Sequence, residues 1–241
     1  SIRSRVGVPA NLQGQAAPTS GGAVQKSIYA HADVKNALNN LQHGICCYCE
    51  THYQASCPGD VEHFRPKNGW QQDRNDKELH QPGYYWLAYK WENLLYACEW
   101  CNRIYKHNYF PLKDPSKRFD PNVKDISEEE PLLINPYEEQ HPENHLKFEG
   151  INIIGLTPEG NASIEYYGLD RKELDEPRRG IYNEINAFVD LSELSRGTPN
   201  EALAQNKVKN FVNQKIYEGQ HTIDNHCIYF LLVSMLFMAA S

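Results

Sequence analysis

Two cysteine pairs decide the fold of this chain: CCYC at positions 46–49 and CEWC at positions 98–101. Thiolates at CxxC spacing are the usual ligands of a closed, tetrahedral structural zinc site. Two such pairs in one chain therefore predict a Zn²⁺ ion held by Cys46, Cys49, Cys98 and Cys101. Cys47 lies between two of these ligands and could replace one of them, but the spacing favours Cys46.

Residues 60–118, which include the second pair, differ in charge from the rest of the chain. The whole chain has a formal charge of −7, which argues against a general polyanion-binding protein. Residues 60–118 contain ten Lys and Arg against eight Asp and Glu, and the remainder contains 14 against 23. Either a small local surface for phosphate contacts or chance accounts for this difference, and the motif described below favours the first.

The cysteine count also bears on the compartment. The chain has seven cysteines, and three of them lie outside the two pairs. An odd number with paired spacing suits metal ligation in a reducing compartment better than a disulfide framework, so we expect a cytoplasmic protein. Cys57 is interpreted as a free thiol and Cys227 as a core residue. The apolar run at 228–240 has 13 residues, against the roughly 20 of a membrane-spanning helix, and predicts a buried C-terminal helix rather than a membrane protein.

The pattern of elements predicts an α+β protein of one domain or two small ones. Residues 1–24 have no apolar period and are expected to form a flexible segment. Residues 25–118 form the expected zinc-containing domain, with a helix at 24–41 and another at about 102–108. Residues 119–241 are expected to hold an exposed acidic stretch at 120–130, β structure at 145–167, and helices from 171, at 201–218 and at about 222–240.

Five aromatic residues crowd one short stretch before the second cysteine pair: Tyr84, Tyr85, Trp86, Tyr89 and Trp91. They could form a small core around the cysteine pairs, or they could be exposed for stacking against nucleic-acid bases. The core interpretation is favoured.

Between the cysteine pairs lies VEHFRPK at 61–67, in which Glu62 directly precedes His63. The stretch is typical of a short strand that ends at Pro66. Neighbouring residues of a strand point to opposite faces. Both side chains could therefore reach one phosphate only if the strand is distorted or a metal ion lies at its edge. A lone histidine is more often structural, but this one is accompanied by an acid and, further along the chain, by Asn93 and Asn102.

The order of these motifs resembles that of the HNH endonucleases, which have a zinc-stabilised ββα-metal core. It is more closely similar to that of the nuclease subunits of Septu-type antiphage systems, including those associated with some retrons. The resemblance rests on CxYCE at 46–50, VEHFRPK at 61–67, WxNLL at 91–95, CxxCN at 98–102 and FPL at 110–112. LLINP at 132–136 and YGLDR at 167–171 extend it weakly. It implies an HNH core surrounded by a small β segment and additional flanking and C-terminal helices.

The resemblance implies a metal-dependent endonuclease that hydrolyses phosphodiester bonds in DNA. His63 matches the general base that activates the attacking water. Glu62 and Asn102 match the ligands of a catalytic Mg²⁺ or Mn²⁺ ion, which prefers oxygen donors. Asn93 matches the residue that holds and orients the loop carrying the histidine, although an asparagine there could also cap a helix.

Some positions depart from the family pattern or leave a choice open. Glu62 stands where many relatives have Asp, so a metal ion would lie further from the strand. His107 could replace Asn102 as the last metal ligand. Charge on the reacting phosphate could be neutralised by Lys106, Arg65 or His107, and Lys106 is included among the expected catalytic residues.

Two functional classes remain in competition. The main alternative to a nuclease is a zinc-stabilised module that binds nucleic acid or another protein without cutting, which the acidic charge favours. The acid–histidine pair together with Asn102 favours the nuclease, and a thiol oxidoreductase is less consistent because these cysteines suit zinc. The resemblance also implies a partner, the ATPase subunit of a bacterial antiphage system, with assembly through that partner at residues 130–241. The sequence does not decide between DNA, RNA and tRNA as the target.

Overall fold

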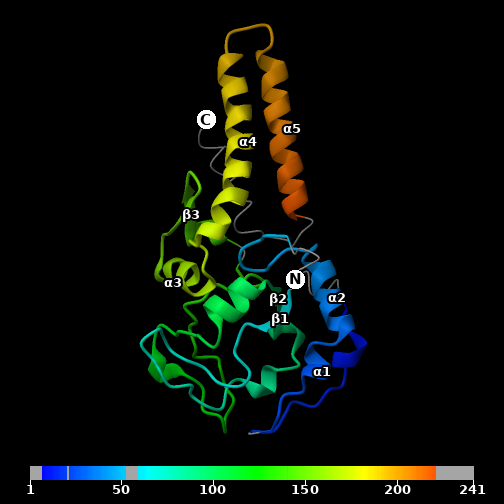
Figure 1. Ribbon diagram of the computed structural model, residues 1–241, viewed down its shortest axis with the longest axis vertical. Coiled ribbons are helices and arrows are strands. Elements are labelled where there is room, and N and C mark those ends of the chain that lie inside the picture. Colours follow the sequence, from blue (N-terminus) through cyan, green and yellow to red (C-terminus); the bar gives the residue numbers. More distant parts are fainter. Residues whose placement is uncertain (1–6, 21, 53–58, 140, 221–241) are drawn as a thin grey trace.

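The computed structural model describes residues 7–20, 22–52, 59–139 and 141–220, with side chains up to residue 211. The architecture is α+β, as predicted. Figure 1 shows a body that contains both small sheets, and a long antiparallel pair of helices, α4 and α5, that projects from it. Cys57, Cys227 and the helix predicted at 222–240 lie outside the described residues. Within the described part of the chain, no helix combines the length and the apolar character that a membrane span requires.

The N-terminal segment, which was predicted to be flexible, contacts the body at a few positions: Pro9 and Leu12 are buried, and most of its other described residues are exposed. Residues Ala10–Leu12 form a 3-10 turn in which Leu12 is 5% exposed. Leu12 belongs to the same buried cluster as Val34 and Leu38 of α2 (Ala32–Leu41). A single buried leucine among polar residues carries no apolar period, so the sequence pattern did not reveal this contact.

The helix predicted at 24–41 is divided in two. α1 (Lys26–Tyr29) ends at Ala30, and α2 begins after His31. Nδ1 of His31 accepts a hydrogen bond from the backbone N–H of Asp33 at 3.2 Å, so this histidine caps the second helix. The break lets α1 turn away from α2 and brings Tyr29 to the first strand.

The central region folds as a hairpin followed by a helical turn. β1 (Asp60–His63) pairs antiparallel with β2 (Leu94–Ala97). The 3-10 turns Tyr85–Leu87 and Trp91–Asn93 precede β2. A π-helical turn, η5 (Trp100–Lys106), follows it, in place of the helix predicted at 102–108. Four of the five aromatic side chains at 84–91 are buried, which confirms the core interpretation.

The hairpin separates two cores and directs adjacent residues of β1 to different ones. Glu62 lies opposite Leu95, and His63 lies opposite Leu94. Residues directly opposite in an antiparallel pair share a face. Leu95 belongs to the core that contains the cysteine pairs, whereas Leu94 belongs to the core that α2 covers. Glu62 and His63 therefore face opposite sides of a regular strand.

The β structure predicted at 145–167 is present only in its first part. β3 (Leu146–Glu149) and β4 (Asn152–Gly155) form a hairpin, but the rest is a helix, α3 (Pro158–Tyr167). Oγ1 of Thr157 accepts a hydrogen bond from the N–H of Gly160 at 3.1 Å, and a proline occupies the first helical position. Thr-Pro-Glu-Gly was interpreted as a turn, but here it is the capped start of a helix.

The two helices predicted from 171 and at 201–218 are confirmed as α4 (Asp175–Leu194) and α5 (Glu201–Gln220). The rings of Phe188 and Phe211 stack between them with their centres 4.1 Å apart. Three leucines near the free end of this pair are exposed: Leu191, Leu194 and Leu203. Short 3-10 turns at Pro115–Lys117, Pro142–Asn144 and Lys172–Leu174 complete the described elements.

Candidate functional site

The four predicted zinc ligands lie together. The sulfurs of Cys46, Cys49, Cys98 and Cys101 are all within 4.8 Å of one another, and among the described residues no other group of His, Cys, Asp and Glu has this geometry. The Sγ atoms of Cys49 and Cys98 are 3.8 Å apart. Zinc–sulfur bonds of about 2.3 Å in a tetrahedron separate the sulfurs by about 3.8 Å. The four side chains therefore fit a Zn²⁺ ion, and Cys47 is not among them.

A buried arginine from the C-terminal half lies against these cysteines; the YGLDR segment that contains it weakly extends the family resemblance, but no role was predicted for it. Nη1 of Arg171 is 3.3 Å from Sγ of Cys101, and Nη2 is 4.0 Å from Sγ of Cys98. Burial alone would lower the pKa of Arg171, but the surrounding thiols outweigh it and raise the pKa. Hydrogen bonds from neighbouring thiols, that of Cys101 first, hold the pKa of Cys49 well below its usual range. Since four thiolates around a zinc ion would carry a net negative charge, this guanidinium would compensate part of it.

Arg171 reaches the cysteines because α3 ends directly against η5. Gly168 closes α3 in the left-handed conformation, with φ of +62°. A Cβ atom at Gly168 would lie 2.4 Å from the ring of Tyr105 in η5, so only glycine permits this approach. The YGLDR segment at 167–171 therefore covers the cysteine group from the C-terminal side.

His63 is held at both of its ring nitrogens and is 3% exposed. Nε2 lies 3.0 Å from the carbonyl oxygen of Ala88. A carbonyl only accepts hydrogen bonds, so we assign the proton to Nε2 and the lone pair to Nδ1. Nζ of Lys67 lies 3.4 Å from Nδ1. Burial first, and Lys67 second, lower the pKa of His63 well below its usual value, so the ring is neutral at physiological pH and Nδ1 can accept a proton.

Tyr29 of α1 covers His63 on the face of β1 that points to the core covered by α2. The two rings meet edge to face with their centres 4.7 Å apart. Nζ of Lys67 lies 4.7 Å from the centre of the same tyrosine ring, in cation–π contact. Any molecule that approaches Nδ1 of His63 must therefore displace Tyr29 or Lys67.

Asn93 fixes the loop that follows His63. Its Oδ1 accepts a hydrogen bond from the N–H of Arg65 at 2.8 Å, and its Nδ2 donates to the carbonyl oxygens of Arg65 and Leu87 at 3.1 and 3.3 Å. Its own carbonyl accepts from the N–H of Phe64 at 3.0 Å. One buried amide thus ties the end of β1 to the turn whose next residue, Ala88, orients His63.

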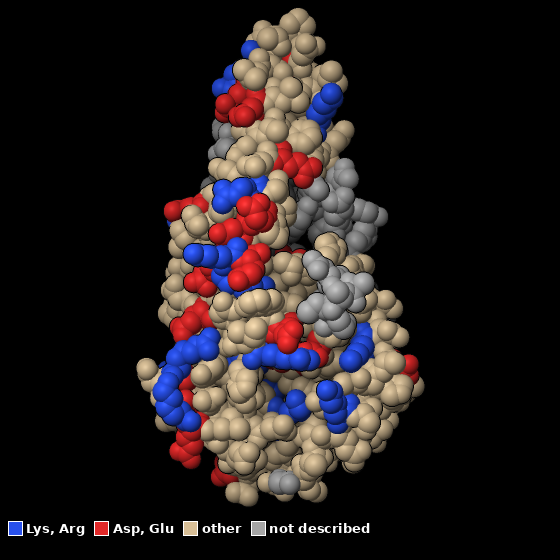
Figure 2. Space-filling view, viewed as in Figure 1, with Lys and Arg blue, Asp and Glu red and all other residues tan. Residues whose placement is uncertain are grey.

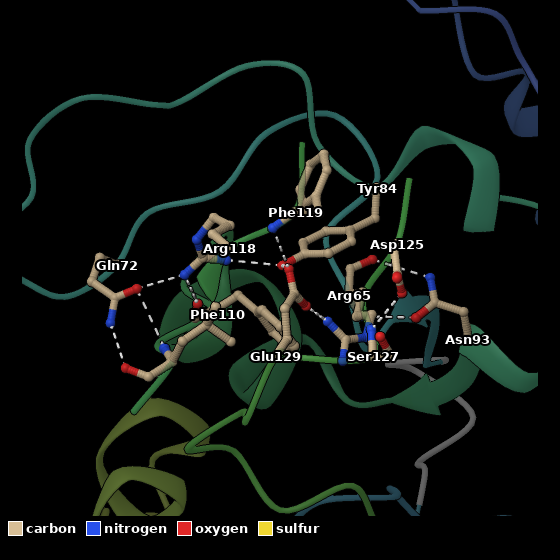
Figure 3. Close-up of polar contacts among 11 residues, drawn as sticks. Arg65, Gln72, Tyr84, Asn93, Phe110, Arg118, Phe119, Asp125, Ser127 and Glu129 are labelled. Carbon is tan, nitrogen blue, oxygen red and sulfur yellow. Dashed lines mark hydrogen bonds and ion pairs between the residues drawn. The ribbon is translucent and has the colours of Figure 1, made fainter. Parts of the chain in front are cut away.

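Arg65 is engaged inside the protein rather than directed at solvent. It forms an ion pair with Glu129, which is 7% exposed (Figure 3). Glu129 also accepts hydrogen bonds from the hydroxyl of Tyr84 at 2.9 Å and the N–H of Phe119 at 3.0 Å, and Arg118 donates to that hydroxyl at 2.9 Å. The acidic stretch at 120–130 was predicted to be exposed, but Glu129 is buried. It supplies the counter-charge that the largely buried guanidinium of Arg65 requires.

Glu62 is paired with a buried lysine from η5 on the other face of the strand. Nζ of Lys106 forms an ion pair with Oε1 of Glu62 at 2.6 Å. Nζ also donates to the carbonyl oxygen of His63 at 3.0 Å. Lys106 is 0% exposed. It was predicted to neutralise charge on a substrate phosphate, but in this structure it neutralises Glu62.

The two candidates for the last metal ligand lie within the first turn of η5 and directly after its last residue. Asn102 is half-buried, and its side-chain amide forms no hydrogen bond with the described residues. His107 is exposed, has φ of +47°, and places Nδ1 3.3 Å from Nδ2 of Asn108. Among the described residues, neither His107 nor Glu62 belongs to a group of three or more His, Cys, Asp and Glu side chains that could hold an ion.

The divalent-ion site expected at Glu62 and Asn102 does not fit this arrangement. Mg²⁺ requires near-octahedral oxygen ligands and keeps several waters, whereas Glu62 is 5% exposed and its Oε1 contacts an ammonium. At an effective dielectric constant near 20, a divalent ion and an ammonium about 4 Å apart repel each other by about 8 kcal/mol. A divalent ion at Glu62 and a protonated Lys106 therefore exclude each other.

Comparison with known proteins identifies relatives but no matching family model and no significantly similar solved structure. The chain is 40% identical over 160 residues to the Septu protein PtuB of Bacillus mycoides (strain KBAB4), covering 65% of this chain and 53% of PtuB. It is 28% identical over 175 residues to the Septu protein PtuA of the same organism, covering 72% of this chain and 24% of PtuA. The chain is therefore homologous to Septu proteins and spans about half the length of PtuB and a quarter of PtuA.

Proposed function

We propose that this chain is an HNH-type endonuclease that hydrolyses phosphodiester bonds in DNA and acts as the effector of an antiphage defence system. The observation that carries the proposal is the state of His63, a neutral ring with one nitrogen fixed by Ala88 and the other facing a cation. The homology to Septu proteins supports the defence role. Asn93 supports the nuclease proposal because it holds the loop that follows His63.

In the proposed reaction, Nδ1 of His63 takes a proton from a water molecule as its oxygen attacks the phosphorus. The bond from phosphorus to the leaving sugar oxygen breaks, and that oxygen takes a proton from solvent. Lys67, at 3.4 Å from Nδ1, offsets the negative charge that grows on the phosphoryl oxygens. A divalent ion at Glu62 and Asn102 would supply the same kind of charge stabilisation. Because Lys106 pairs with Glu62, no step is assigned to such an ion.

The distribution of charge is compatible with a nucleic-acid substrate. Figure 2 shows several Lys and Arg side chains across one face of the body, together with some acidic side chains, and acidic and basic side chains also mix along the projecting helices. Phosphate contacts by such side chains supply affinity that does not depend on sequence. The substrate is therefore proposed to cross the body, and the projecting helices are left for a partner.

The proposed partner is the ATPase subunit of the same system, and the proposed docking region is 130–241. The exposed leucines at the end of α4 and α5 support this, because Leu194 is 82% and Leu203 57% exposed. Leu194→Asp combined with Leu203→Asp should reduce co-purification with the ATPase subunit. Val123→Asp is the matched control, since Val123 is an apolar residue of the body that is 68% exposed. Undiminished co-purification of the leucine variant would contradict this placement.

Cutting is tested with the zinc-loaded chain and supercoiled plasmid, with and without the ATPase subunit. We expect nicked or linear product with the wild-type chain and with His141→Ala, in which an exposed histidine outside the site is removed. His63→Ala should yield no product. Equal cutting by His63→Ala and the wild-type chain would refute the role of His63.

One observation favours the alternative of a non-cleaving binding module: His63 is buried under Tyr29, as a structural histidine would be. That reading predicts DNA binding in a gel-shift assay, no product under any of these conditions, and no effect of His63→Ala on binding. Product formation that depends on His63 would exclude it.

A further inference from the structure

We propose that the Lys106 ammonium is the resident cation of the Glu62 carboxylate, in the position where a divalent ion was expected. The native chain then binds no divalent ion at Glu62. The consequence for catalysis rests on the proposed function, but the statement about cation binding holds whether or not the chain cuts DNA.

The first support is the completeness of the contacts around Lys106. Its side chain has no exposed surface, and its ammonium contacts Oε1 of Glu62 at 2.6 Å and the carbonyl oxygen of His63 at 3.0 Å. Both oxygens belong to β1, so the lysine closes η5 onto the strand. A buried ammonium is strongly destabilising without a partner, and Glu62 is the carboxylate that contacts it. An ion at Glu62 would both repel the ammonium and leave it without a counter-charge.

The second support is the shape of the element that carries Lys106. η5 is π-helical, and the N–H of His107 donates to the carbonyl oxygen of Asn102, five residues earlier, at 2.7 Å. Such wide turns are rare and occur frequently at functional sites. The last residue of this turn is Lys106, whose side chain is buried against β1. The widened turn thus delivers a cation to the carboxylate from the same element as the proposed ligand Asn102.

The third support is the local charge. Glu62, Lys106 and Lys67 together carry one net positive charge next to a neutral His63. Lys67 has a lowered pKa because of burial first, and Glu62 and Lys106 act on it in opposite directions. A phosphate at Nδ1 of His63 therefore meets the ammonium of Lys67 without an added ion. Hydrolysis that depends on His63 and Lys67 then needs no divalent ion at Glu62.

The test measures Mn²⁺ binding to the zinc-loaded 241-residue chain by the electron paramagnetic resonance signal of free Mn²⁺. Mn²⁺ binds thiolate sites much more weakly than Zn²⁺ and leaves the cysteine group intact. Lys106→Met and Lys106→Gln remove the ammonium while keeping a side chain of similar length. Lys113→Met is the matched control, because Lys113 pairs with Glu159 and Glu130 at the surface. Circular dichroism and zinc content establish that each variant is folded.

The wild-type chain and Lys113→Met should show only weak surface binding. Lys106→Met or Lys106→Gln should bind one further equivalent of Mn²⁺, and adding Glu62→Gln should abolish it. A wild-type chain that binds one equivalent lost in Glu62→Gln would overturn the proposal. The proposal would also be overturned if Lys106→Met and Lys106→Gln are folded but bind no additional Mn²⁺, because Glu62 would then not be a cation-binding position even without the ammonium. Neither result depends on plasmid cutting, so failure here is distinct from failure of the nuclease proposal.

Discussion

Replacing Asn93 by alanine tests whether one buried amide holds the loop on which the candidate site depends. The side chain is 5% exposed and makes three hydrogen bonds, to the N–H and carbonyl of Arg65 and to the carbonyl of Leu87. Asn93→Ala removes all three and leaves their partners without a replacement. Asn102→Ala is the matched control, because it removes the same chemical group from a side chain that makes no hydrogen bond with the described residues.

The expected loss of stability follows from the number of contacts. A buried hydrogen bond contributes about 1 kcal/mol net, and each partner left unsatisfied adds to the cost, so Asn93→Ala should lower the free energy of unfolding by about 2–4 kcal/mol. For a chain of this length that corresponds to a fall in Tm on the order of 10 °C. Asn102→Ala should change the free energy of unfolding by less than about 0.5 kcal/mol.

Urea unfolding followed by tryptophan fluorescence measures this difference, since the chain has four tryptophans. Plasmid cutting by Asn93→Ala is then compared with cutting by the wild-type chain at a temperature where both are folded. Asn93→Ala should cut at least about tenfold more slowly, because the turn that orients His63 is no longer tied to β1. Equal free energies of unfolding for Asn93→Ala and Asn102→Ala would refute the reasoning. If Asn93→Ala is less stable but cuts plasmid at the wild-type rate, Asn93 has only a structural role.

Three further outcomes are expected. Arg171→Met should release zinc to a colorimetric chelator about tenfold faster than the wild-type chain, whereas Arg103→Met, a change at a surface ion pair, should not; equal release rates would contradict the contact with the sulfurs. Glu129→Gln should lower the free energy of unfolding by about 3–5 kcal/mol, and the exposed Glu128→Gln should change it little, as urea titration would show. Because the pKa of His63 is lowered in the fold, the unfolded chain binds this proton first as pH falls below about 6.5; stability should therefore fall more steeply in wild type than in His63→Gln, and parallel curves would contradict the assigned burial.

The parts of the fold that the sequence predicted correctly are those fixed by local spacing. Two residues between cysteines are enough to place both sulfurs of a pair on one ion, so the four candidate ligands followed from the sequence alone. α4 and α5 likewise followed from apolar residues at helical intervals. The choice of Cys46 over Cys47 depended on the same spacing, and the sulfur positions agree with it.

The errors arose where one short sequence suits two conformations. Thr157 and Pro158 begin a helix in this protein, but a Thr-Pro-Glu-Gly sequence also suits a turn, and Ile164 and Tyr166 are two residues apart as in a strand. Packing against η5 and β4 decides for the helix, and that information lies outside the segment. The buried partner of Arg65 was missed for a related reason, because Glu129 lies 64 residues away along the chain.

Partners that are distant along the chain also explain why counting charges in the sequence overestimated the positively charged surface available to a substrate. Cations near the motif that looked like phosphate ligands have internal anions: Lys106 has Glu62, and Arg65 has a buried glutamate. Their burial stabilises the hairpin and the loop after it, so they are not free to meet a phosphate. Lys67, which contacts a histidine and an aromatic ring rather than a carboxylate, is the cation that remains suited to that task. A site with so little positive charge of its own binds a polyanion weakly, and this is a physical reason to expect that a partner subunit brings the nucleic acid to it.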